Sequence, residues 1–138
     1  HSMVEYEDGA VMAQLGTPDM KLPIQYALYY PERRYLPGAR LDFWKMGKLE
    51  LEEPDMETFT GLRLAYEAGR VGGSLPTVFN AANERAVSLF LARKIGYLDI
   101  PAIIEECMRV HRVIPEPTVA EILAAEQMVY EQIESRWK

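Results

Sequence analysis

The side chains best suited to catalysis or metal binding are few in this sequence and stand far apart. There are two histidines, His1 and His111, and a single cysteine, Cys107. No Cys-x-x-Cys or His-x-x-x-His pair provides the spacing of a zinc site. We interpret Cys107 as an inert, partly buried thiol and His111 as a favourable partner of a helix C-terminal dipole. An independent enzyme built on either residue would lack a reaction partner nearby in the sequence.

Three polar residues, Asn80, Asn83 and Glu84, interrupt an otherwise apolar helical pattern. Asparagine disfavours a helix interior because its side chain competes for backbone hydrogen bonds. Two interpretations are open for this group. Either the amides satisfy backbone groups of a neighbouring loop, or the three residues form a polar contact with another domain.

A third candidate is the loop Gly16-Thr17-Pro18-Asp19, together with Met20 after it. Because proline fixes its backbone angle φ, Pro18 predicts a loop of defined shape. Asp19 is expected to cap the helix that follows. Methionine is flexible and polarizable, so Met20 suits either ordinary packing or a pocket that adapts to a ligand.

The elements that position this loop are predicted to be a β-hairpin and a short helix. Strands are expected over residues 2–7 and 10–15, because Asp8-Gly9 between alternating runs favours a tight turn with positive φ. The helix is expected over residues 21–29, and its spacing predicts burial of Leu22, Tyr26 and Tyr29. Since an isolated hairpin is marginally stable in water, it should belong to a larger sheet. A missing part of the chain or a second copy would supply that sheet.

The rest of the chain is predicted to be a linker followed by helices. Residues 31–57 contain several prolines and glycines and no lasting helical period, although the alternation over 49–52 is typical of a short edge strand. The apolar spacing then predicts a bundle of three to four helices, over residues 58–70, 76–94, 99–112 and 118–136. Thr118 and Glu121 have the spacing of a capping box. The expected core of the bundle includes Leu62, Ala65, Tyr66, Val78, Ala82, Ala86, Leu89 and Phe90. The predicted fold class is therefore an α+β fragment with an all-α C-terminal bundle.

Composition narrows the classes of protein that this chain can represent. Its 138 residues fit one ordinary domain or two very small ones. A formal net charge of −6 argues against nucleic-acid binding, which favours a basic surface. The single cysteine excludes an internal disulfide and fits a reducing compartment. No apolar stretch approaches the roughly 20 residues that span a bilayer.

Three strings, taken together and in order, resemble the 1-deoxy-D-xylulose 5-phosphate reductoisomerase family. They are HSMVEYEDGA (1–10) with AQLGTPDM (13–20), LDF (41–43) and PTVFNAANERAV (76–87). The resemblance implies three segments. Residues 1–30 would be the C-terminal part of the central catalytic and dimerisation domain, 31–57 a linker, and 58–138 the C-terminal helical domain. It also favours a piece of a longer chain over residues left by a tag.

The resemblance implies an enzyme that converts 1-deoxy-D-xylulose 5-phosphate to 2-C-methyl-D-erythritol 4-phosphate in isoprenoid biosynthesis, using NADPH and Mg²⁺ or Mn²⁺. The cofactor domain and the metal ligands would precede residue 1, so we expect this chain alone to be inactive and to bind no cofactor. His1 matches a histidine at the border of the substrate site, and Pro18 and Met20 match positions that pack against the substrate backbone. The family also implies a homodimer through the N-terminal strands, in the bacterial cytoplasm or in a plastid.

A different class of protein remains as the alternative. The chain would then be a non-catalytic helical interaction module with a dimerising hairpin. The two hypotheses differ in one cheap observation, the open reading frame that contains the chain. A frame that extends far upstream and carries a nucleotide-binding glycine fingerprint excludes the module, whereas a frame that starts at Met3 excludes the enzyme.

Overall fold

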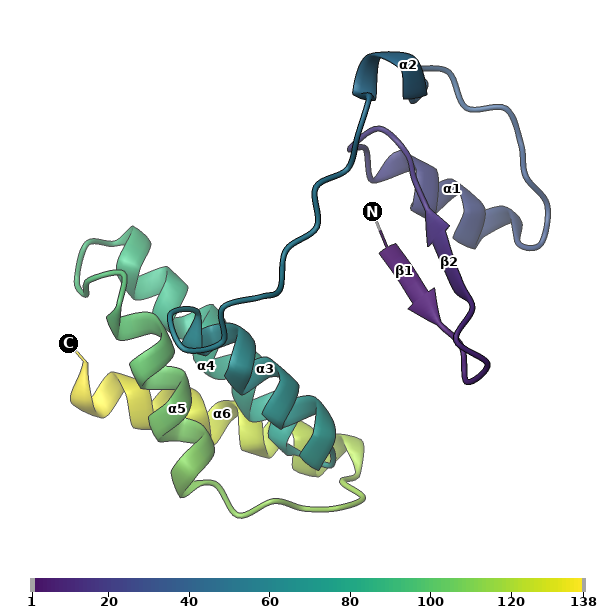
Figure 1. Ribbon diagram of the computed structural model, residues 1–138. Coiled ribbons are helices and arrows are strands. Elements are labelled where there is room, and N and C mark those ends of the chain that lie inside the picture. Colours follow the sequence, from purple (N-terminus) through teal and green to yellow (C-terminus); the bar gives the residue numbers. More distant parts are fainter. Residues whose placement is uncertain (1, 138) are drawn as a thin grey trace. The chain divides into compact units, whose positions relative to one another are not determined.

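A computed structural model describes residues 2–137 of the chain (Figure 1). The chain forms two compact units that divide between Glu52 and Glu53. The first unit contains β1 (Ser2–Glu5), β2 (Val11–Gln14), α1 (Lys21–Tyr29) and α2 (Phe43–Met46). The second, which we call the helical unit, contains α3 (Thr60–Val71), α4 (Leu75–Leu91), α5 (Asp99–Val110) and α6 (Val119–Arg136). The predicted α+β class, with a hairpin first and a helical bundle after it, is confirmed.

The hairpin is the only sheet among the described residues. Its strands are antiparallel, with Val4 opposite Met12. The turn is one residue longer than predicted, since Tyr6 N–H donates to the Ala10 carbonyl at 2.9 Å across three loop residues. Asp8 Oδ1 accepts from Ala10 N–H at 3.0 Å, and Gly9 has a φ of +83°. A side-chain hydrogen bond and a left-handed glycine thus stabilise a three-residue turn, and each strand is shorter than expected.

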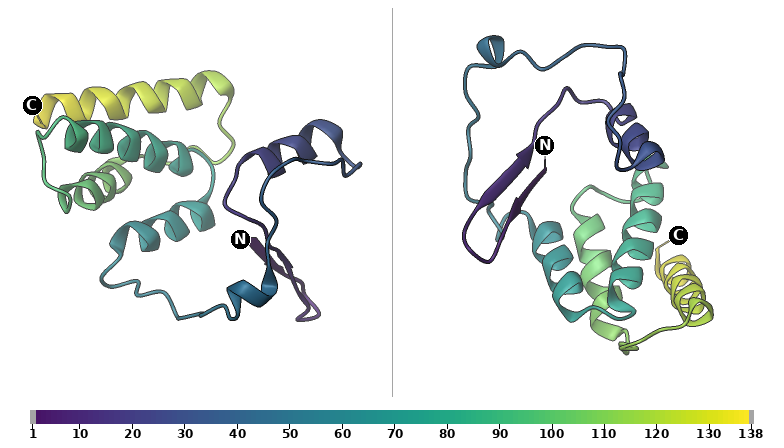
Figure 2. Two further views of the ribbon diagram at one scale, coloured as in Figure 1. Left: turned by 90° about the horizontal axis from the view of Figure 1, so that it is seen from above. Right: turned by 90° about the vertical axis from the view of Figure 1, so that its right-hand side faces the viewer.

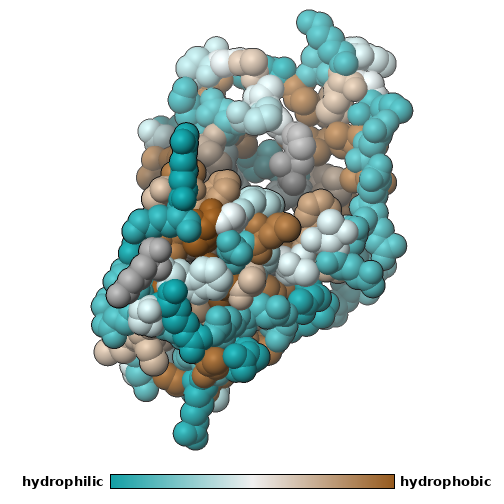
Figure 3. Space-filling view, turned by 90° about the vertical axis from the view of Figure 1, so that its left-hand side faces the viewer, coloured by the Kyte–Doolittle hydropathy of each residue, from teal (hydrophilic) through white to brown (hydrophobic). Residues whose placement is uncertain are grey.

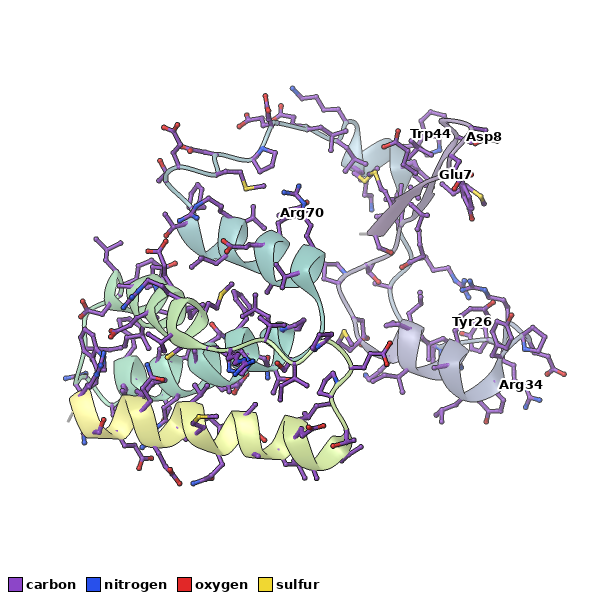
Figure 4. All side chains as sticks on the ribbon, turned by 90° about the horizontal axis from the view of Figure 1, so that it is seen from below. Glu7, Asp8, Tyr26, Arg34, Trp44 and Arg70 are labelled. Atoms are coloured by element: carbon purple, nitrogen blue, oxygen red, sulfur yellow. The ribbon has the colours of Figure 1, made fainter. Side chains whose placement is uncertain are left out.

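Helix α1 has the predicted bounds but not the predicted cap or burial. Its N-cap residue is Met20, and Asp19 Oδ1 instead accepts from Lys21 N–H at 2.9 Å. No side chain of α1 is fully buried, because the first unit is too small to enclose one. Both tyrosines expected in a core, Tyr26 and Tyr29, make cation–π contacts with arginines. The guanidinium carbon of Arg33 lies 3.7 Å from the ring centroid of Tyr26, and that of Arg34 lies 4.1 Å from the ring centroid of Tyr29. Figure 4 shows Arg34 beside the C-terminal end of α1.

The connecting segment contains one helical turn that the sequence pattern does not predict. Asp42 caps α2 by accepting from the N–H groups of Trp44 and Lys45, at 3.0 Å and 3.2 Å. The edge strand considered over residues 49–52 is not formed in the described chain. Alternation alone does not make a strand without a neighbouring edge to pair with.

The helical unit has a continuous apolar core. Helix α4 contacts each of the other three helices, and Figure 2 shows them from two further directions. Val78, Ala82, Ala86 and Leu89 are buried as predicted, whereas Phe90 is 36% exposed. The predicted buried face of α3 is wrong, because the buried residues of this helix are Leu64 and Ala68 rather than Leu62, Ala65 and Tyr66. The capping box of Thr118 and Glu121 is confirmed at the start of α6.

Candidate functional site

The loop that joins β2 to α1 lines two hollows of the first unit. One hollow, of about 450 Å³, is lined by Gln14, Pro18, Met20 and Pro23 among others. We call it the Met20 hollow. The two residues expected from the sequence at a substrate site, Pro18 and Met20, both line this surface.

Met20 combines a fixed backbone with an exposed side chain. Its carbonyl accepts from Ile24 N–H at 3.2 Å, in the first turn of α1. Met20 is 70% exposed, and Pro18, two residues before it, is also exposed. Within this chain Met20 is therefore not core, and its thioether is free to contact a group that the chain itself does not supply.

The second hollow, of about 430 Å³, lies between the loop and residues 36–41. We call Tyr35–Leu41 the brace, because two side chains bond to its backbone. Thr17 Oγ1 donates to the Ala39 carbonyl at 3.2 Å, and Gln25 Nε2 donates to the Tyr35 carbonyl at 3.1 Å. Half-buried leucines contribute the apolar lining of this hollow, namely Leu15, Leu22, Leu36 and Leu41. The sequence contains no local signal for the brace, since each hydrogen bond joins residues 10 or 22 positions apart.

His1, the third residue expected at the site, lies outside the described residues. The polar group of α4 lies in the helical unit. Asn80 and Glu84 are exposed, and Asn83 is half-buried beside an apolar groove that Phe79 and Tyr97 also line. Within residues 2–137 neither amide makes a hydrogen bond to a loop, so the first interpretation of these residues gains no support. Figure 3 shows one face of the molecule, where apolar surface lies among hydrophilic side chains.

His111 has a partner that the sequence did not reveal. Its Nε2 lies 2.7 Å from Oγ of Ser74, a fully buried residue, and the same oxygen accepts from Ile114 N–H at 2.9 Å. Burial lowers the pKa of His111 and so disfavours the cationic ring that a helix dipole would stabilise. His111 stands at the C-cap of α5, and its interpretation as a dipole partner stays a prediction. A serine beside a histidine can be a nucleophile with its base. Ser74 is closed to any substrate, however, and we assign the pair a structural role.

Cys107 is likewise unsuited to chemistry. The residue is buried in the core of the helical unit, and burial raises the pKa of its thiol to about 11. Almost none of it is thiolate near neutral pH, which fits the inert role expected for it. Among the described residues no three His, Cys, Asp or Glu side chains are grouped closely enough to hold a metal ion. No described helix combines the length and apolar character needed to cross a membrane.

Comparison with known proteins gives one consistent result. The sequence profile of the DXP reductoisomerase C-terminal domain matches residues 15–132. The chain is 64% identical over 137 residues to 1-deoxy-D-xylulose 5-phosphate reductoisomerase of Lachnospira eligens, and 61% identical over 137 residues to that of Agathobacter rectalis. Each match covers 99% of this chain but 36% of the relative, so the chain spans about a third of their length.

Solved structures agree with these matches. The reductoisomerase of Zymomonas mobilis in complex with NADPH superposes with a TM-score of 0.86 at 40% identity, over 100% of this chain and 36% of that one. A second structure, of DOX-P reductoisomerase with fosmidomycin and magnesium, gives a TM-score of 0.85 at 38% identity, over 99% of this chain and 36% of that one.

Proposed function

The chain belongs to the DXP reductoisomerase family, and on that premise we propose that it forms the C-terminal part of an NADPH- and divalent-metal-dependent reductoisomerase. The complete enzyme would convert 1-deoxy-D-xylulose 5-phosphate into 2-C-methyl-D-erythritol 4-phosphate. The observation that carries the proposal is 64% identity along 99% of the chain to a relative of that name. Solved relatives in complex with NADPH and with magnesium support the choice of cofactors.

We assign the cofactor and metal sites to the part of the enzyme outside this chain. The described residues do not fit a metal site, since no three potential ligands are grouped among them. We therefore expect the chain alone to have no reductoisomerase activity. NADPH supplies the hydride in such an enzyme, whereas the residues present here would contribute to the shape of the substrate site.

The proposed division of the chain is 1–30 as the end of the central domain, 31–57 as a linker and 58–138 as the C-terminal helical domain. It is supported by the boundary between the two compact units, which falls between Glu52 and Glu53 and so inside the proposed linker. The separate apolar core of α3–α6 also supports an independent helical domain.

In the proposed substrate site, Pro18 and Met20 form an apolar wall. Polar groups elsewhere would hold the phosphate and the metal-bound oxygens, while these side chains shield the carbon backbone of the substrate from water. The exposure of Met20 on the Met20 hollow supports this role. His1 would stand at the border of the same site.

We also propose that the complete enzyme is a homodimer through the N-terminal strands. Both β1 and β2 are edge strands of a two-stranded sheet, and their apolar side chains Met3, Val4, Val11 and Met12 are exposed. Such edges and faces favour pairing with a further strand or a second copy.

The test is the oxidation of NADPH, followed by absorbance, with 1-deoxy-D-xylulose 5-phosphate and Mg²⁺ or Mn²⁺. The full-length protein that contains this chain should turn over, and the purified 138-residue chain should not exceed background. Absence of turnover by folded full-length protein would refute the proposed activity, and turnover by the chain alone would refute the assignment of the cofactor sites.

A further inference from the structure

We propose that Thr17 is a positioning residue of the reductoisomerase site, which holds the loop bearing Pro18 and Met20 against the brace. The inference rests on the proposed function of these two residues. It goes beyond that function because it assigns a role to a residue that is not itself part of the reaction. Thr17 acts through the loop, by a hydrogen bond to a segment 22 residues further along the chain.

The loop needs an anchor at this position because it makes few polar contacts of its own. Pro18 has no N–H to donate, and Gly16 has no side chain to restrain its backbone. Asp19 is bonded forward, to Lys21 N–H at 2.9 Å, so it fixes the start of α1 rather than the body of the loop. Within the described chain the hydroxyl of Thr17, at 3.2 Å from the Ala39 carbonyl, is the side-chain link between the loop and the brace.

The position of Thr17 makes it an effective anchor for the two site residues. It directly precedes Pro18, and a residue before proline is already restricted to extended backbone angles. Fixing its side chain therefore leaves little freedom to the proline that follows. Thr17 is half-buried while Pro18 and Met20 are exposed, and all three line the Met20 hollow, so the anchor lies directly beside the proposed contact surface.

The brace has a second anchor besides Thr17. Gln25 holds its other end through the Tyr35 carbonyl at 3.1 Å, and half-buried leucines line the hollow beneath it. Loss of the Thr17 hydroxyl should consequently loosen the loop without unfolding the first unit. A looser loop holds its apolar wall less accurately against the substrate, and this weakens binding more than it slows the chemistry.

The experiment compares three substitutions in the full-length enzyme, assayed by NADPH oxidation. Thr17→Val keeps the shape and removes the donor, and it should raise KM for 1-deoxy-D-xylulose 5-phosphate roughly 2- to 10-fold, the range expected for one net hydrogen bond. Its kcat should stay within about 2-fold of the parent enzyme. Thr17→Ser keeps the donor and should restore KM. The matched control is Thr77→Val, the same chemical change at a half-buried position of α4, which should leave KM unchanged.

A double-mutant cycle with Met20→Ala tests whether Thr17 acts through the loop. The effect of Thr17→Val on KM should shrink once Met20 is truncated, since there is less left to position. Because KM does not depend on how much of the enzyme is folded, partial unfolding of a variant cannot imitate either result. Equal KM values for Thr17→Val and Thr17→Ser, or full additivity with Met20→Ala, would overturn the inference. Failure of the proposed function itself would show earlier, as absence of turnover by the parent enzyme.

Discussion

Gly73→Ala should destabilise the helical unit more than any other small substitution in the turn between α3 and α4. Gly73 has a φ of +58°, and a Cβ atom built on it would lie 2.3 Å from the Ile114 carbonyl oxygen and 3.1 Å from Cα of Pro115. Both neighbours are backbone atoms and cannot rotate away as a side chain end would. The segment at Ile114 must therefore move by about 1 Å to restore ordinary contact distances.

That movement disturbs a specific group of hydrogen bonds. Ser74 N–H donates to the Ile114 carbonyl at 2.9 Å, and Ile114 N–H donates to Ser74 Oγ at 2.9 Å. Each is worth about 1 kcal/mol net, and the left-handed backbone adds about 1–2 kcal/mol for a residue with a Cβ. Together these terms predict a loss of about 3–4 kcal/mol in the free energy of unfolding, a large share of the stability of a small domain.

Urea denaturation of the 138-residue chain, followed by circular dichroism at 222 nm, measures this loss. The matched control is Gly69→Ala, because Gly69 lies within α3 and nothing is within 4 Å of a Cβ placed there. Alanine is the better helix former, so this variant should be as stable as the parent or up to about 1 kcal/mol more stable. Equal urea midpoints for Gly73→Ala and Gly69→Ala would refute the close approach of Ile114 to this turn.

Three further predictions concern single side chains. In the full-length enzyme Met20→Ala should lower kcat/KM roughly tenfold, which corresponds to about 1.4 kcal/mol of transition-state stabilisation. Its Tm should be unchanged because the Met20 side chain is exposed. A loss of about 2–5 kcal/mol in stability with normal kinetics would instead show that Met20 is a core residue. Burial holds the pKa of His111 below its ordinary 6.5, so the folded state binds a proton less readily than the unfolded chain. The urea midpoint should therefore fall as the pH drops below 6.5. In the His111→Gln variant this fall should be smaller. Cys107 should react with a disulfide reagent at pH 8 only after urea unfolds the chain; prompt reaction in the folded state would contradict its burial and raised pKa.

Elements with local signals could be predicted from the sequence, and those that depend on distant neighbours could not. The sequence predicts the bounds of helix α1 correctly because the loop before it and Pro31 after it mark both ends. The capping box at Thr118 was likewise visible, since its partner Glu121 is three residues away. The sequence does not predict helix α2 because one turn has no measurable period, and a single cap at Asp42 stabilises it.

The buried face of α3 shows a different limit. Leu62, Ala65 and Tyr66 form one helical stripe, and Leu64 and Ala68 form another, so periodicity alone does not choose between them. Packing against α4 and α5 selects the second stripe, and these partners are not encoded within α3 itself. The same reason hides the contacts of Ser74 with His111 and of Thr17 with Ala39, which join residues 37 and 22 positions apart.

The two units differ in how much buried core this chain supplies to each of them. This difference decides which proposals can be tested on the chain alone. Between residues 2 and 52 no side chain is fully buried, whereas α3–α6 enclose a core that includes Val78, Ile103 and Ile133. Folding free energy comes mainly from such burial, so the helical unit has its own source of stability and the hairpin has little. The tests of Gly73, His111 and Cys107 can therefore use the 138-residue chain. The roles of Thr17, Pro18 and Met20 require the full-length enzyme, since in the proposed function the surfaces that cover the hairpin and face the Met20 hollow belong to the rest of it.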